Sequence, residues 1–155
     1  MKVAIDTSAL VCLAWREARS EKVVSAYRAM KRPVLVISDL ILLEAATAIR
    51  AKAYIEKSGQ PIRLHVEIER ARDAALGRLK TMLDRSLVRQ QALDWAEWLE
   101  LAERLARTWA EKVGARTLDI LHVAFAICTH CTCLITNDSR QASMAAGEGI
   151  KAMEV

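Results

Sequence analysis

Short apolar, β-branched runs alternate along the chain with longer stretches whose apolar residues recur at helical spacing. Such runs are typical of strands buried within a sheet. They cover residues 2–5 (KVAI), 34–38 (VLVIS), 131–136 (CTCLIT) and 150–155 (IKAMEV). A further run, 87–89 (LVR), fits either a brief edge strand or a turn.

Helical periodicity occupies the segments between these runs. The predicted helices cover residues 8–18, 20–31, 40–58, 61–85, 92–113 and 117–130, and a short one follows Asp138. Strands that alternate with helices favour a mostly parallel sheet with helices on both faces. We therefore expect an α/β fold in which residues 1–155 form a single domain.

The composition agrees with a globular, helix-rich protein. Hydrophobic residues make up 53% of the chain, which is enough for a sizeable core, and glycine and proline are scarce. The net charge of +4 is only a weak indication of a polyanionic partner. The sequence shows no targeting segment and no run of about twenty uncharged apolar residues, so we expect a cytoplasmic protein that does not contact a membrane.

Four acidic residues stand where ligands bind in parallel α/β sheets. Asp6 and Asp138 each follow a predicted strand, at its carboxyl end. Glu44 and Asp119 interrupt apolar stretches near the starts of two helices, and burying an unpaired acid is costly. Because helix N-termini and strand C-termini share one edge of a parallel sheet, we expect all four acids to meet there.

A carboxylate cluster with no matching basic residues indicates a site for a hard divalent cation. Mg²⁺ or Mn²⁺ takes oxygen ligands, and such an ion activates water for attack on a phosphodiester. Without the ion, we expect mutual repulsion to raise the pKa of at least one acid. Hydroxyl groups that can orient the ligands or touch a phosphate belong to Thr7, Ser8 and Thr136.

Each acid also has an ordinary structural interpretation when it is taken alone. Asp6 fits a helix cap, and Asp138 fits a turn residue. Glu44 fits an ion-pair partner of Arg50, and Asp119 fits a first-turn residue placed for the helix dipole. The joint pattern of four acids at one sheet edge favours a metal site over these separate roles.

The blocks around these acids resemble a known family. "KVAIDTSAL", "SDLILLEAATAIR", "TLDILHVAFA" and "LITNDSRQASMA" resemble the four motif blocks of PIN domains, most closely those of VapC-type toxins from prokaryotic toxin–antitoxin pairs. The resemblance spans nearly the whole chain and implies a sheet of four or five parallel strands flanked by helices. The family's metal-binding and catalytic acids match Asp6, Glu44, Asp119 and Asp138. Its polar positions beside them match Thr7 or Ser8, Thr136 and Asn137.

The resemblance further implies a Mg²⁺- or Mn²⁺-dependent endoribonuclease, a homodimer, and a small antitoxin whose tail blocks the active site. The alternatives are a PIN-type RNA-processing nuclease and a non-catalytic module that binds RNA or protein. The helices over 61–85 and 92–113 are long for a compact VapC toxin, and we expect them to form an extended helical arm. Candidates for contact with the RNA backbone are Arg16, Arg50, Arg116 and Arg140.

Two further groups of residues allow a different chemistry. His122 follows Asp119 by three positions and can approach the acids, although packing within the helix is the favoured interpretation. A zinc or redox site is the rival interpretation of the closely spaced thiols Cys128, Cys131 and Cys133, beside His130. A zinc module usually shows two such knuckles and this chain shows one, so a buried strand is favoured here.

Overall fold

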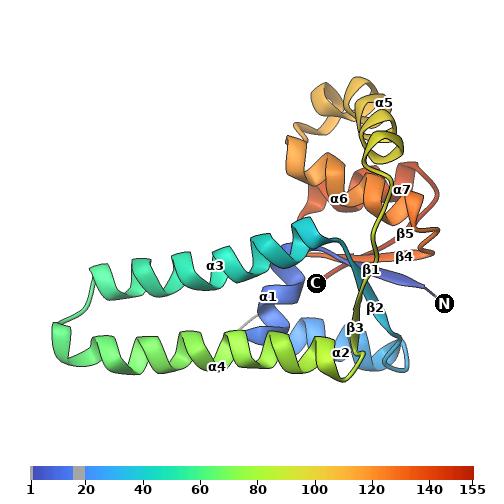
Figure 1. Cartoon of the computed structure of the whole chain (residues 1–155). Helices are drawn as coiled ribbons and strands as arrows, with labels where there is room; N and C mark the ends of the chain where they lie inside the picture. Colours follow the sequence, from blue (N-terminus) through green and yellow to red (C-terminus); the bar gives the residue numbers. More distant parts are fainter. Residues whose placement is uncertain (1, 16–19) are drawn as a thin grey trace.

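The computed structural model describes residues 2–15 and 20–155, and its centre is a five-stranded, fully parallel sheet (Figure 1). Across the sheet the strands lie in the order β3-β2-β1-β4-β5. Their bounds are Val3–Ile5 (β1), Leu35–Ile37 (β2), Val88–Gln90 (β3), Cys133–Thr136 (β4) and Lys151–Glu154 (β5). The predicted α/β fold is confirmed, and the run at 87–89 contributes to an edge strand rather than to a turn.

The central strands are the most apolar, and they end at the same edge of the sheet. Every residue of β1 and β4 is buried, whereas the edge strands β3 and β5 keep exposed residues. Ile5 pairs with Ile135, and the backbone N–H of Asp6 donates to the Ile135 carbonyl at 3.0 Å. This register brings Asp6 level with Thr136, two residues before Asp138.

Two groups of helices cover the two faces of the sheet (Figure 1). One group comprises α1 (Thr7–Ala14), α2 (Ser20–Ala29), α3 (Asp39–Ser58) and α4 (His65–Asp84). The other comprises α5 (Trp95–Val113), α6 (Thr117–Cys128) and α7 (Ser139–Gly147). Among the described residues, no helix has both the length and the apolar character that crossing a membrane requires.

An extended helical arm projects from the sheet, as α3 and α4 run antiparallel and the 3-10 turn η1 (Ile62–Leu64) joins them (Figure 1). The arm is therefore present, but the prediction that residues 92–113 belong to it was wrong. Those residues form α5, which packs against α6 on the opposite side of the sheet.

The apolar stripe of α5 explains this placement. Trp98, Leu105 and Trp109 lie along one side of the helix and are buried. The indole Nε1 of Trp98 donates to the Leu121 carbonyl at 2.9 Å, which satisfies its polar atom inside the core. The stripe needs an apolar partner, and α6 provides one because residues 119–126 are all buried.

Candidate active site

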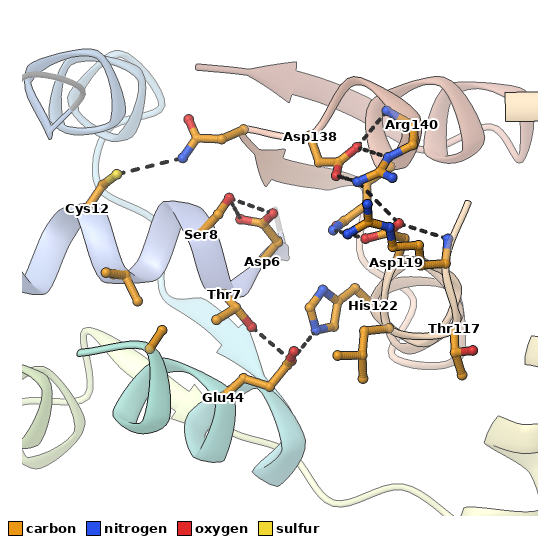
Figure 2. Close-up of a pocket in the computed structure, with 16 residues that line it drawn as sticks. Asp6, Thr7, Ser8, Cys12, Glu44, Thr117, Asp119, His122, Asp138 and Arg140 are labelled. Carbon is orange, nitrogen blue, oxygen red and sulfur yellow. Dashed lines mark hydrogen bonds and ion pairs between the residues drawn. The ribbon is translucent and has the colours of Figure 1, made fainter. Parts of the chain in front are cut away.

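A cavity of about 830 Å³ lies at the carboxyl edge of the sheet, and all four predicted acids line it (Figure 2). Asp6 follows β1 and Asp138 follows β4. Glu44 lies in the second turn of α3, and Asp119 in the first turn of α6. The expectation that these acids meet at one place is confirmed, while their catalytic roles remain predictions.

Asp6 is the most enclosed of the four acids, with an exposed fraction of 1%. Its Oδ1 accepts from the backbone N–H of Ala9 at 2.8 Å, which caps α1, and its Oδ2 accepts from Thr136 Oγ1 at 2.8 Å. The Ser8 hydroxyl also donates to this carboxylate. Burial raises the pKa of Asp6 above its ordinary value, although these hydrogen bonds oppose the shift. A raised pKa was predicted, but burial rather than repulsion between acids is its main cause.

Glu44 is held by a histidine and a threonine from two other helices. His122 Nε2 lies 2.6 Å from Glu44 Oε2, and Thr7 Oγ1 donates to the same oxygen at 2.9 Å (Figure 2). Burial works to raise the pKa of Glu44, but the His122 hydrogen bond and charge, with the Thr7 hydrogen bond, outweigh it and lower that pKa. His122 is buried, as packing predicted, and it also fixes the Glu44 carboxylate.

Arg140 forms ion pairs with the other two acids, Asp119 and Asp138 (Figure 2). Its Nη2 lies 2.5 Å from Asp138 Oδ2 and 3.6 Å from Asp119 Oδ2, and its Nε donates to Asp138 Oδ1 at 3.0 Å. The Arg140 hydrogen bond lowers the pKa of Asp138 below its ordinary value. The prediction that no basic residue matches the acids was therefore wrong.

Asp119 receives further hydrogen bonds from the N-cap of α6 and from α7. The backbone N–H of Arg116 donates to its Oδ2 at 2.9 Å, and Gln141 Nε2 donates to its Oδ1 at 3.3 Å. Gln141 was missed in the sequence, although its position three residues after Asp138 places it in the first turn of α7. Helical spacing from a candidate ligand was the available signal.

Some of the ordinary structural roles are also present. Asp6 and Asp138 are the N-caps of α1 and α7. Glu44 contacts His122 instead of Arg50, whose Nη1 donates to the Ala46 carbonyl. The other predicted polar residues line the cavity or contact its acids, and they are Thr7, Ser8, Thr136 and Asn137. Of the candidate arginines, Arg116 and Arg140 line the cavity, whereas Arg16 lies outside the described residues.

The donor chemistry of the cavity fits a hard divalent cation, because four carboxylates line one space. In the arrangement described, however, no three Asp, Glu, His or Cys side chains of residues 2–15 and 20–155 converge as a ligand set. Glu44 contacts His122, and Asp138 contacts Arg140.

The thiols form part of the core, as the favoured interpretation predicted. Cys131 and Cys133 are buried and Cys128 is partly exposed, and none forms a disulfide. Burial raises the pKa of all three thiols, which disfavours the thiolate needed for metal binding or redox chemistry. Cys133 begins β4, the strand that leads to Asp138.

The raised pKa of Asp6 predicts a pH dependence of stability in the metal-free protein. The folded state binds this proton more tightly than the unfolded state, so its contribution to the free energy of unfolding is present at low pH and lost as pH rises through the raised pKa. Asp6→Asn removes that loss. We expect the free energy of unfolding of the variant to rise relative to that of the unchanged protein between about pH 4 and pH 7. Urea unfolding in EDTA measures it, and a pH-independent difference would contradict the prediction.

Comparison with known proteins places this fold and cavity in a family. The family model for the PIN domain matches residues 3–147, and the chain therefore belongs to the PIN-domain family. PIN domains are generally nucleases that use divalent metal ions. A search of curated proteins found no match.

A solved structure shows the same fold. It is a chain in the crystal structure of VapBC2 from Rickettsia felis bound to a DNA fragment from their promoter. The two chains superpose with a TM-score of 0.64, and the match covers 99% of this chain and 98% of that one. Their sequences are 16% identical, so the likeness establishes the fold alone.

Proposed function

We propose that this protein is a Mg²⁺- or Mn²⁺-dependent endoribonuclease of the VapC type, the toxin of a toxin–antitoxin pair. The observation that supports it best is the convergence of Asp6, Glu44, Asp119 and Asp138 on one cavity at the carboxyl edge of the sheet. Membership of the PIN family and the likeness to a chain of VapBC2 add support. The antitoxin, the RNA substrate and a homodimer are parts of this proposal.

Asp6 and Asp119 are proposed as the most direct ligands of the ion, because both line the cavity and are the two buried acids of the four. Asp138 and Glu44 would complete the site. When bound, the ion supplies an activated water and stabilises the charge of an in-line displacement at phosphorus.

The side chains around the acids restrict how the carboxylates can turn. Ser8, Thr136 and the Ala9 amide hold both oxygens of Asp6, and Thr7 and His122 hold one oxygen of Glu44. Carboxylates fixed in this way keep their geometry when substrate arrives, which is what an efficient site requires. Asp119 also gains from its place in the first turn of α6, where the helix dipole favours negative charge.

Removal of the metal is the direct test of this function. The purified protein is incubated with single-stranded RNA in Mg²⁺, in Mn²⁺, and in excess EDTA. We expect cleavage with either ion, its loss in EDTA, and its recovery when Mg²⁺ is added in excess of the chelator. The physical reason is that an ion held by the carboxylates of the cavity would lower the pKa of a bound water and so supply the attacking hydroxide.

Two outcomes would contradict the proposal in different ways. Equal cleavage with and without EDTA would mean that the carboxylate site is not the source of the activity. RNA binding without cleavage under any ion would favour the non-catalytic module instead. A DNA strand of the same sequence, tested in parallel, shows whether the activity is specific for RNA.

A further inference from the structure

The guanidinium of Arg140 occupies the side of the cavity where Asp119 and Asp138 face each other (Figure 2). We call its ion pairs with these two acids the Arg140 bridge. We infer that the Arg140 bridge competes directly with a divalent cation, so that the metal-free site is neutralised by the protein itself and metal loads only when Arg140 turns away. This inference rests on the proposed function and concerns how that site is regulated.

The contacts of the bridge involve two of the four carboxylates that line the cavity. Arg140 donates hydrogen bonds to both oxygens of Asp138, and its Nη2 forms an ion pair with Asp119 Oδ2 at 3.6 Å. The positive charge therefore already lies beside the oxygens that would bind the ion. A guanidinium and a divalent cation cannot share these oxygens at close range, because like charges repel strongly in a partly enclosed cavity. The apparent affinity for the ion is then reduced by the fraction of molecules in which the bridge is closed.

Unpartnered polar atoms in the same cavity indicate that the closed arrangement is not the ligand-bound one. Among the described residues, four buried side-chain polar atoms have no hydrogen-bond partner, and three of them belong to residues that line this cavity. They are His122 Nδ1, Asn137 Oδ1 and Gln141 Oε1. His122 and Gln141 are 3% and 4% exposed, and buried polar atoms ordinarily have a hydrogen-bond partner. A ligand shell that enters when the bridge opens would give them partners.

The structure also allows Arg140 to leave without disturbing Asp138. The Arg140 side chain keeps 30% of its surface exposed, so it has room to turn towards solvent. The backbone N–H of Arg140 still donates to Asp138 Oδ1 at 2.8 Å, and the Asp138 N–H donates to Thr136 Oγ1 at 2.9 Å. These bonds do not involve the guanidinium, so Asp138 stays in place while its Oδ2 becomes available.

Titration of the full-length protein with Mn²⁺ in a calorimeter tests the inference without any measurement of activity. Arg140→Gln should bind Mn²⁺ at least about fivefold more tightly than the unchanged protein, a usual size for coupling between two ligands. Arg140→Lys should lie between the two, because an ammonium cannot span both carboxylates as a planar guanidinium does. Arg116→Gln is the matched control. Arg116 lines the same cavity, but among the described residues Arg140, and not Arg116, forms the ion pairs with Asp119 and Asp138.

The outcomes separate this inference from the proposed function. Equal Mn²⁺ affinity in Arg140→Gln and Arg116→Gln, or weaker binding in Arg140→Gln, would overturn the competition and leave a metal-dependent nuclease intact. An absence of Mn²⁺ binding in all of the proteins would overturn both. Circular dichroism confirms that each variant is folded, and Arg140→Lys, which keeps the charge, provides the comparison if Arg140→Gln unfolds.

Discussion

Asp119→Asn is expected to reduce RNA cleavage by about a thousandfold or more. A bound ion supplies several kcal/mol of transition-state stabilisation, and each ~1.4 kcal/mol corresponds to a factor of ten in rate. Asparagine keeps an oxygen that can accept from the Arg116 N–H. Its amide can donate to Gln141 once the Gln141 amide turns, because Gln141 Oε1 has no partner in the present arrangement. The fold should therefore survive while the metal ligand is lost.

Asp39→Asn is a suitable control for this prediction. Asp39 also lies in the first turn of a helix, α3, but its carboxylate accepts from Gln90 and does not line the cavity. The variant removes the same charge and should cleave RNA at close to the normal rate. Single-turnover cleavage of a labelled RNA measures both variants. Cleavage by Asp119→Asn within tenfold of the unchanged protein would show that Asp119 is not a ligand of the catalytic ion.

Phe125→Ala is expected to lower the free energy of unfolding by about 3–5 kcal/mol, the usual cost of truncating a buried phenylalanine. Phe125 is fully buried in α6, and its ring lies 6.0 Å from that of Trp98 at an interplanar angle of 60°. Removing the ring leaves a cavity beside Trp98 of α5 and removes an edge-type aromatic contact. Because α6 also bears Asp119 and His122, the loss should loosen one wall of the active site.

Leu118→Ala provides the comparison on the same helix. Leu118 is 43% exposed, so its truncation removes little buried surface and should change the free energy of unfolding by less than about 1 kcal/mol. Urea unfolding followed by circular dichroism measures both variants. A similar small loss for both would mean that the contact between Phe125 and Trp98 contributes little to holding α5 against α6.

The sequence predicted the sheet and the meeting of the acids because both depend on local pattern. Short, continuous apolar runs are typical of buried strands, and the parallel arrangement follows from the helices between them. The arm was only partly predicted, since two consecutive amphipathic helices can pair with each other or with other elements. The helix α5, with its buried tryptophans, packs against α6, and no property of α5 alone specifies that partner.

The cysteines of residues 128–138 (CTHCTCLITND) are a second case in which the sequence left two interpretations open and the structure decided between them. Their spacing allowed a metal or redox site, whereas the structure buries Cys131 and Cys133 in the core, just before and at the start of β4, where burial raises the pKa of each thiol. Asn137 and Asp138, which follow the strand, are the residues of this segment that line the cavity.

The sequence by itself determined which elements form, and it placed four acids at one edge of a parallel sheet, because strand and helix ends are set by local patterns of apolar and capping residues. Only the tertiary structure decided how those acids are neutralised. His122 of α6 contacts Glu44 of α3, 78 positions away, and Arg140 of α7 forms an ion pair with Asp119 of α6. Such contacts depend on side-chain direction and on the packing of separate helices, which short-range sequence patterns do not specify.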